Sequence, residues 1–364
     1  MKIFTPLLLL LISIPAYAAE DLKLTLPPTI YAVPGVTLGI YHDNMVLSEN
    51  SSAYNFEYKC KIGNIEPRRW VIKPTDEDVG SHPIEVLVKD AAGRILEKAK
   101  SNLRISPRNS EVTKTLRILI VGDSLTHATV YPNELARLLS VPGNPKPIFL
   151  GTHKPASALM GVAHEGYGGW TWNNFLTKFD PETPGAPNPR KTKSPFLFPS
   201  ADGKEGVFDL NRYFLQHCKN QPPDVVLFLL GINDCFGANP ENPDADIKKV
   251  LDIADKLLAA FHKAAPDAIL GVGLTTPPNS RQSAFSENYK DKYTRWGWKR
   301  IQHRLVQLMI ERFSQREKDG IHLVPTELNL DPVDGYPINN GVHPNSIGYS
   351  QISASFYGWI KAKF

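Results

Sequence analysis

The feature that most constrains this fold is a set of continuous apolar runs, each ending at a glycine or a short turn. The clearest lie at 117–122, 224–231 and 268–274. A strand that is buried on both faces reads as such an unbroken run, and this pattern is typical of parallel sheets. Shorter runs at 148–150 and 321–324 extend the same pattern. The sequence therefore predicts a buried parallel sheet.

Helical periodicity fills the gaps between these runs. Apolar residues at three- and four-residue spacing over 247–261 fall on one face of a predicted helix. A second amphipathic helix is predicted over 293–316, and a last one follows His343. Strands that alternate with helices predict an α/β fold with helices on both faces of the sheet. In such folds the working site lies beyond the carboxyl ends of the strands.

A different pattern precedes this α/β region. Residues 20–110 contain alternating apolar and polar residues, clearest at 84–90, together with turn signals. They predict a small all-β, immunoglobulin-like module. The polar segment 106–110 ends it, and the α/β domain is predicted over 115–364. The module holds no constellation of catalytic residue types, so packing, spacing and weak glycan contact stay open as its role.

The N-terminus is typical of a secretion signal. Lys2 supplies a positive charge, 7–14 form a short apolar core, and Ala16-Tyr17-Ala18 offers a cleavage site. The apolar run is too short to span a bilayer. Residues 1–18 are therefore predicted to be a signal peptide, and the protein is expected to be periplasmic or extracellular, without a membrane span.

Charge and cysteine content exclude some functions. The 41 basic and 37 acidic residues give a net charge of +4, with no basic stripe of the kind that binds nucleic acid. The three cysteines are neither closely paired nor accompanied by histidines at zinc-site spacing, so we expect no metal. In an oxidising compartment the simplest arrangement is one disulfide and one buried thiol. We predict a Cys218–Cys235 disulfide and a free Cys60.

The first strand of the α/β region is followed by a candidate nucleophile. Ser124 stands in the segment Gly122-Asp123-Ser124-Leu125, at a predicted turn between strand and helix. Such a turn exposes the hydroxyl and puts the serine N–H at a helix N-terminus, where it can stabilise an anion. The alternative interpretation is an ordinary helix-capping serine.

Three later residues offer complementary chemistry. Asn233 follows the run 224–231, and its amide can donate to a developing oxyanion, although Asn-Asp pairs also form ordinary turns. Gly169 allows its backbone N–H to approach a ligand closely, although a glycine-rich loop can simply be flexible. His343 follows the last strand, on the side where the other candidates gather, and is a candidate base.

Together these segments resemble, in order and local context, the four blocks of the SGNH, or GDSL, hydrolases. The matching residues are Ser124, Gly169, Asn233 and His343, with the literal segments 122–125, 231–234 and 342–345. The resemblance covers roughly residues 115–364. It implies a three-layer α/β/α, flavodoxin-like domain that hydrolyses esters without metal or cofactor.

The resemblance also implies a role for each of these residues. Ser124 would attack the ester carbonyl, and His343 would remove its proton. The N–H groups of Ser124 and Gly169, with the Asn233 amide, would hold the oxyanion. Water would then clear the acyl-enzyme.

One position departs from the family pattern. Where the family has an aspartate three residues before its histidine, this chain has Asn340. An asparagine carbonyl can still accept the imidazole N–H, but it brings no charge to stabilise the imidazolium. Either another carboxylate supports His343, with Asp334 the nearest in sequence, or His343 works in a dyad oriented by the amide alone.

The substrate is predicted from the residues around the glycine block. Tyr167, Trp170 and Trp172, with the loop 180–209, are expected to form an aromatic rim that suits sugar faces, and Asp234 is expected to contact substrate. The glycine-tryptophan motif is similar to that of bacterial SGNH carbohydrate esterases that remove acetyl groups. An acetylated polysaccharide is therefore the expected substrate.

Two other functions stay open at this point. The same serine suits a general short-chain esterase or acyltransferase acting on a small ester. Asn340 and the added β module also suit a non-catalytic carbohydrate-binding protein on a degenerate hydrolase scaffold.

Overall fold

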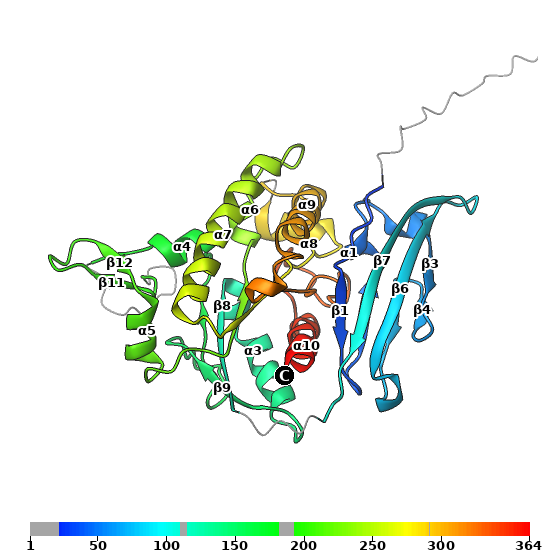
Figure 1. Ribbon diagram of the computed structural model, residues 1–364. Coiled ribbons are helices and arrows are strands. Elements are labelled where there is room, and N and C mark those ends of the chain that lie inside the picture. The colour runs from blue at the N-terminus through cyan, green and yellow to red at the C-terminus, as the bar shows by residue number, and fades with distance from the viewer. Residues whose placement is uncertain (1–21, 110–114, 182–192, 291) are drawn as a thin grey trace, which may run out of the picture.

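The computed structural model describes residues 22–109, 115–181, 193–290 and 292–364 of the 364-residue chain. A β region formed by the N-terminal segment lies beside an α/β domain, and helix α10 (Ser346–Lys363) runs between them (Figure 1). The predicted signal peptide lies outside the described residues.

The α/β domain is built on a parallel sheet in the order β10-β8-β13-β14-β15, with β9 also paired to β8. Every residue of β13 is buried, as its unbroken apolar run predicts. All five predicted runs form strands of this sheet. The strands are β8 (Thr115–Gly122), β9 (Lys146–Leu150), β10 (Glu165–Gly166), β13 (Val225–Leu229), β14 (Ile269–Gly273) and β15 (Ile321–Val324).

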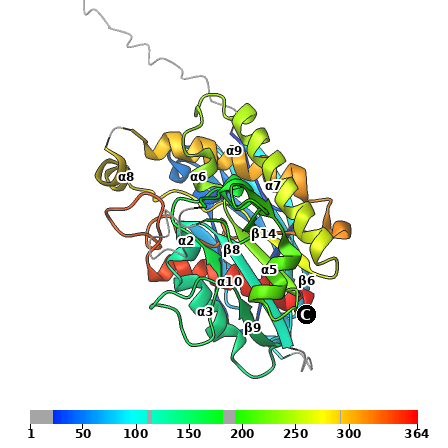
Figure 2. The same ribbon diagram turned by 90° about the vertical axis from the view of Figure 1, so that its left-hand side faces the viewer.

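Helices cover both faces of the sheet, which confirms the predicted three-layer fold. Helix α3 (Val130–Leu139) packs with α10 on one face, and α7 (Asp244–Ala264) packs with α9 (Arg295–Phe313) on the other. The two pairs lie in the lower and upper halves of both ribbon views (Figures 1 and 2). The shorter helices are α2 (Ser124–His127), α4 (Trp172–Thr177), α5 (Leu210–His217), α6 (Ile232–Cys235) and α8 (Gln282–Tyr289).

Side-chain size sets how closely each helix approaches the sheet. On one face, a Cβ at Gly271 of β14 would lie 2.9 Å from the Trp359 ring of α10, so only a glycine lets this helix pack so closely. On the other face, Phe228 of β13 contacts Phe261 of α7 with ring centroids 5.4 Å apart. Apolar side chains therefore fill both layers of the core.

The N-terminal region consists of two small sheets, in the orders β1-β7-β6-β3 and β2-β5-β4, that share one apolar core. The all-β prediction is confirmed, although the larger sheet is mixed because β1 runs parallel to β7. The strands are β1 (Thr29–Ala32), β2 (Leu38–Tyr41), β3 (Asn55–Lys59), β4 (Asn64–Glu66), β5 (Arg69–Ile72), β6 (Gly80–Lys89) and β7 (Ile95–Ile105). The boundaries 20–110 and 115–364 stay predictions.

The β region is joined to the α/β domain by buried hydrogen bonds. The Gly39 N–H donates to Asn329 Oδ1 at 2.7 Å. Asn44, in the one-turn helix α1 (His42–Met45), donates its Nδ2 to the carbonyls of Glu327 at 2.7 Å and Leu330 at 2.8 Å. Because buried polar groups are costly to leave unpaired, these bonds fix the position of the region on the domain.

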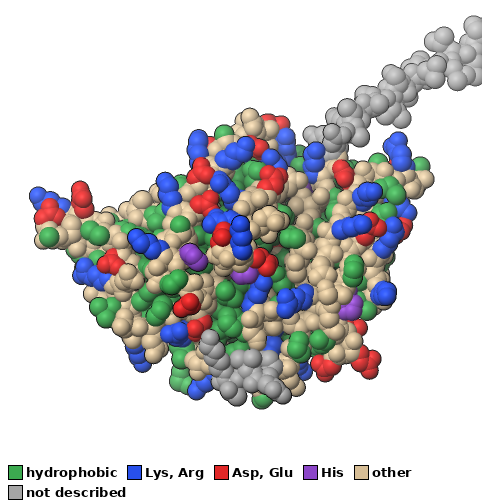
Figure 3. All heavy atoms as spheres, in the orientation of Figure 1, with side chains coloured by type: hydrophobic (Ala, Val, Ile, Leu, Met, Phe, Trp, Pro, Cys, Tyr) green, Lys and Arg blue, Asp and Glu red, His purple; other side chains and the backbone are tan. Residues whose placement is uncertain are grey.

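Charged residues are distributed without a single-sign patch on the face of the molecule that Figure 3 shows. Basic and acidic side chains intermingle over the face that Figure 3 shows, rather than forming a basic stripe. Within the described stretches of the chain, no helix combines the length and the apolarity that crossing a membrane requires.

Candidate active site

Ser124 lies at the first residue of helix α2, directly after strand β8. The preceding turn is tight: a Cβ at Gly122 would lie 1.9 Å from Thr126 Oγ1, so no other residue fits there without movement. Asp123 caps the helix by accepting the Leu125 N–H at 2.9 Å. This turn leaves the Ser124 side chain half-buried at the carboxyl end of the sheet.

The His343 imidazole faces Ser124 from the loop between β15 and α10. Its Nε2 lies 2.8 Å from Ser124 Oγ, although the two residues are 219 positions apart in the chain. Burial lowers the pKa of His343 from its ordinary value, because desolvation disfavours the charged ring. The imidazole is therefore neutral at pH 7 and able to accept the hydroxyl proton.

Asn340 orients this imidazole. Its Oδ1 accepts three hydrogen bonds, from the Val342 N–H at 3.2 Å, the His343 N–H at 2.9 Å and His343 Nδ1 at 3.0 Å. Backbone N–H groups only donate, so the atom that faces the ring is the amide oxygen. Nδ1 must then carry the hydrogen, which leaves the Nε2 lone pair free to accept a proton from Ser124.

Asp334 does not take part in this arrangement. Its carboxylate pairs with Arg68 at 2.6 Å and is 61% exposed. Both ring nitrogens of His343 are already occupied, by Ser124 and Asn340. The alternative in which Asp334 supports the histidine is therefore wrong, because this side chain is held at the edge of the β region by an arginine.

The glycine block and Asn233 come together beside Ser124. Asn233, on α6, donates its Nδ2 to the Trp170 carbonyl at 3.0 Å and lies 3.5 Å from Asp123 Oδ2. The second contact is at the limit of hydrogen bonding, so one amide hydrogen remains available for an oxyanion. Gly169 has a φ of +80°, and a Cβ added there would meet nothing within 4 Å. In the described part of the protein, the space that a side chain would fill at Gly169 is therefore open.

Two buried carboxyl groups lie behind the nucleophile. Burial raises the pKa of Asp123 to about 7, and the neighbouring charge of Asp234 adds to this shift. Burial likewise raises the pKa of Asp234 to about 7. Asp234 accepts the Trp172 N–H at 3.0 Å and thereby holds the start of α4. The prediction that Asp234 contacts substrate is therefore wrong.

The predicted aromatic rim is wrong. Tyr167, Trp170 and Trp172 are at most 3% exposed. Tyr167 and Trp170 pack with ring centroids 4.5 Å apart, and Trp172 stacks on Phe228 at 5.3 Å. An alternation of glycine and aromatic residues is equally typical of an exposed rim and of a tightly packed loop. Here the aromatic rings pack into the core, because burying their apolar surface is favourable. Part of the predicted loop 180–209, residues 182–192, lies outside the described residues.

Glu165 is a site residue that the sequence reading missed. Its fully buried carboxylate accepts hydrogen bonds from the hydroxyls of Tyr167, Tyr213 at 2.6 Å and Thr152 at 2.9 Å, and from the Thr152 N–H at 2.6 Å. It thereby fixes the start of the glycine block that ends at the oxyanion site. The sequence signal that could have indicated Glu165 is its position as the only charged residue in a segment of glycines and aromatic residues, 165–172.

A group of histidines also connects the nucleophile helix to β10. His127 Nδ1 lies 2.9 Å from His153 Nε2. His164 accepts the Gly166 N–H at Nδ1, so its Nε2 carries the hydrogen and donates to Thr129 Oγ1 at 3.0 Å. Burial lowers the pKa of His164 to about 3 and that of His153 to about 4. His153 and His164 are therefore uncharged near neutral pH.

The predicted disulfide is absent, because Cys218 and Cys235, like Cys60, are free thiols. Burial, with the Glu165 carboxylate nearby, raises the pKa of Cys218 to about 12. Burial and the adjacent Asp234 raise the pKa of Cys235 as well. The two thiols lie in different surroundings, Cys218 near Tyr213 and Glu165 and Cys235 near Asp234 and Asp246.

A serine at a strand-to-helix turn, a histidine from the loop before the last helix and clustered amide donors define a serine hydrolase on a three-layer α/β/α fold. Residues 118–356 match the model of the family described as GDSL-like Lipase/Acylhydrolase, and the chain belongs to this family.

Comparison with curated proteins finds no match. Among solved structures the chain is similar to a family 3 carbohydrate esterase from Clostridium thermocellum, at 20% identity over 67% of this chain and 94% of that chain, with a TM-score of 0.40. A family 3 carbohydrate esterase from Talaromyces cellulolyticus is similar at 17% identity over 66% and 94%, with a TM-score of 0.40. A carbohydrate acetylesterase from Sinorhizobium meliloti is similar at 14% identity over 69% and 100%, also with a TM-score of 0.40.

Proposed function

We propose that this esterase removes O-acetyl groups from a polysaccharide outside the cytoplasm, with Ser124 as nucleophile and His343 as base. The observation that carries the catalytic part is the 2.8 Å contact between Ser124 Oγ and His343 Nε2, on a ring whose tautomer Asn340 sets. This contact also argues against a purely carbohydrate-binding role, because a degenerate site has no reason to retain it.

The reaction follows from this geometry. As Ser124 Oγ bonds to the acetyl carbon, its proton passes to His343 Nε2, and the former carbonyl oxygen becomes an oxyanion. The N–H groups of Ser124 and Gly169 and the Asn233 amide stabilise that charge. Collapse of the intermediate breaks the bond to the sugar oxygen, which takes the proton from His343. Water then attacks the acetyl-enzyme with the same base, and acetate leaves.

The open approach to the oxyanion site supports a bulky alcohol in the substrate. Among the described residues, no atom lies within 4 Å of a Cβ added at Gly168 or at Gly169, so the described part of the protein leaves this side of the site open. A small acyl group on a large alcohol, such as a sugar unit in a chain, suits that shape. The predicted signal peptide supports a substrate outside the cytoplasm, where acetylated polysaccharides are met.

Acetate release from a panel of acetylated xylan, mannan and pectin tests this proposal. We expect release from at least one polymer, and its loss in Ser124→Ala at an unchanged melting temperature. Hydrolysis of p-nitrophenyl acetate without acetate release from any polymer would instead indicate a general short-chain esterase. Failure to hydrolyse either kind of ester would contradict the catalytic assignment itself.

A further inference from the structure

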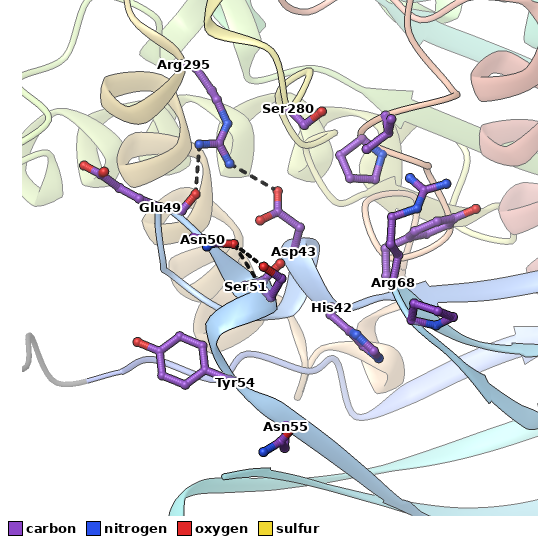
Figure 4. A pocket seen from close by; sticks show the side chains of 15 residues that line it. His42, Asp43, Glu49, Asn50, Ser51, Tyr54, Asn55, Arg68, Ser280 and Arg295 are labelled. Carbon is purple, nitrogen blue, oxygen red and sulfur yellow. Dashed lines mark hydrogen bonds and ion pairs between the residues drawn. The ribbon is translucent and has the colours of Figure 1, made fainter. Parts of the chain in front are cut away.

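A cavity lies at the junction of the β region and the α/β domain, formed by residues far apart in the chain. It has a volume of about 480 Å³. Figure 4 shows His42, Asp43 and Tyr54 on its β-region side, with Arg295 and Ser280 reaching it from the α/β domain. We name it the junction pocket. Neither Ser124 nor His343 lines it.

Two buried polar atoms of the junction pocket have no partner in the described part of the protein. His42 is 6% exposed, and its Nε2 makes no hydrogen bond. The ring cannot turn away easily, because it stacks on Phe56 with centroids 4.0 Å apart and an interplanar angle of 6°. The Arg295 Nε–H is likewise unpaired, although its other nitrogens reach Glu49 and Asp43. Buried polar groups rarely stay unpaired, and each of these two atoms has almost no accessible surface. They make the wall behind the pocket polar without contacting a ligand directly.

The charges at the pocket are largely neutralised within the protein. Lys299 donates to Asp43 Oδ1 at 2.6 Å, and Arg68 pairs with Asp331 at 2.9 Å. Burial lowers the pKa of His42 to about 4, so its ring is neutral at pH 7. Glu49 also lines the pocket and has no ion pair in the described part of the protein, but its carboxylate points away from Asp43 and Ser280 (Figure 4). The charged groups that face the pocket therefore offer no unpaired charge to a strongly charged ligand.

The remaining lining offers uncharged polar groups beside an aromatic ring. Asn50, Ser51, Asn55 and Ser280 supply amides and hydroxyls. Tyr54 is half-buried, because its ring rests partly on the core of the β region. A sugar ring has flat apolar faces and hydroxyl groups at its edges. The faces match the aromatic ring, and the hydroxyl groups match the amides and hydroxyls of this wall.

We propose that the junction pocket is an accessory binding site for neutral sugar units of a carbohydrate chain. This inference rests on the proposed function in one respect, namely that the substrate is a polysaccharide. Backbone hydrogen bonds connect the pocket to the catalytic loop. The Ser280 N–H donates to the Pro332 carbonyl at 2.7 Å, and the adjacent Asn279 N–H donates to the Gly341 carbonyl at 2.9 Å. A chain held there is thereby bound beside the loop that carries His343.

Calorimetric titration of the full-length protein with xylo-, manno- and galacto-oligosaccharides of about six units tests this site directly. Tyr54→Ala removes the aromatic wall, and Ser52→Trp, at an exposed lining residue, fills the mouth. Ala92→Trp adds the same indole at an exposed turn of the β region outside the pocket and is the matched control. Hydrolysis of p-nitrophenyl acetate reports the catalytic site separately.

We expect at least one oligosaccharide to bind, and Tyr54→Ala or Ser52→Trp to weaken binding at least about tenfold, as loss of an aromatic contact at a binding site commonly does. Ala92→Trp should bind as the unaltered protein does, and p-nitrophenyl acetate turnover should be unchanged in all three variants. Binding of no oligosaccharide, or equal binding by both pocket variants and the control, would overturn the inference. Because unacetylated sugars serve as probes, this outcome is independent of whether any polymer releases acetate.

Discussion

At the scale of single residues, Asn340 orients the His343 imidazole but brings no negative charge to stabilise its protonated form. In the serine hydrolases that the chain resembles, an aspartate both orients the histidine and stabilises its charged form. Here the amide oxygen keeps the orienting hydrogen bond at 3.0 Å and adds two bonds from backbone N–H groups. The site therefore has the correct imidazole tautomer without a charged partner.

Asn340→Asp should raise turnover, because a carboxylate stabilises the imidazolium that forms in the transition state. It should also raise the pKa that governs the acidic limb of the pH profile by about one unit. Asp334→Asn is the matched control and should leave both quantities unchanged, because Asp334 pairs with Arg68. Steady-state kinetics across pH 5–9 measure both effects. Unchanged kinetics in Asn340→Asp, with loss of activity in Asp334→Asn, would contradict the assignment.

The unaltered enzyme should have an acidic limb below pH 6.5, the ordinary pKa of histidine. Burial lowers the pKa of His343, and the base acts in its neutral form, so activity persists until pH falls through that lowered pKa. The pH dependence of kcat/KM measures this limb. A limb centred above pH 7 would show that a different group, or a charged partner, controls the reaction.

At the scale of elements, the strand-to-helix turn before α2 is what presents the nucleophile. Gly122 lies between Thr126 Oγ1 and the Leu229 carbonyl, where an added Cβ would be 1.9 Å and 3.0 Å from them. Burial of the turn under neighbouring strands leaves little room for adjustment. The position of Ser124 thus depends on a residue that takes no part in the chemistry.

Gly122→Ala should therefore displace α2, reduce esterase activity about 100-fold or more, and destabilise the protein by about 2 kcal/mol. Gly237→Ala is the control, because a Cβ there meets nothing within 4 Å and its backbone is unstrained. Activity assays and urea unfolding of both variants give the comparison. Equal behaviour of the two variants would show that the turn tolerates a side chain.

A second element-scale effect comes from the segment after β15. Glu327 is 1% exposed, neither carboxyl oxygen has a partner in the described part of the protein, and burial raises its pKa from 4.5 to about 8. The folded state keeps this group protonated, whereas the unfolded chain ionises it above pH 4.5. Its contribution to stability is therefore complete below pH 4.5 and declines until pH 8, by on the order of 5 kcal/mol.

Glu327→Gln should remove this dependence, because an amide of the same shape does not ionise. The variant should gain more stability relative to the unaltered protein at pH 8 than at pH 5. Chemical denaturation at these two pH values measures the difference. An equal effect at both would show that Glu327 is not protonated in the folded protein.

At the scale of the whole molecule, the sequence predicted what depends on local patterns. Unbroken apolar runs predicted the parallel strands, and the apolar face predicted over 247–261 is the buried face of α7. The order of Ser124, Gly169, Asn233 and His343 predicted the residues that the fold gathers at one end of the sheet.

What the sequence did not predict depends on contacts between distant segments. Tyr167 and Trp170 were expected at a rim, because an aromatic residue beside glycine suits either a surface or a core. The cysteine pairing failed because composition does not reveal which thiols meet. The junction pocket joins residues near 42–55 with others near 280–333, and no periodicity in either segment indicates that they are neighbours.

Covalent labelling with a fluorophosphonate tests the central claim most directly, because this reagent reacts with a serine that a neighbouring base activates. We predict one label per molecule by intact mass, located on Ser124 by peptide mapping, and none on a folded Ser124→Ala variant. A label on another serine, or no label on protein that hydrolyses p-nitrophenyl acetate, would contradict the assignment of Ser124 as nucleophile.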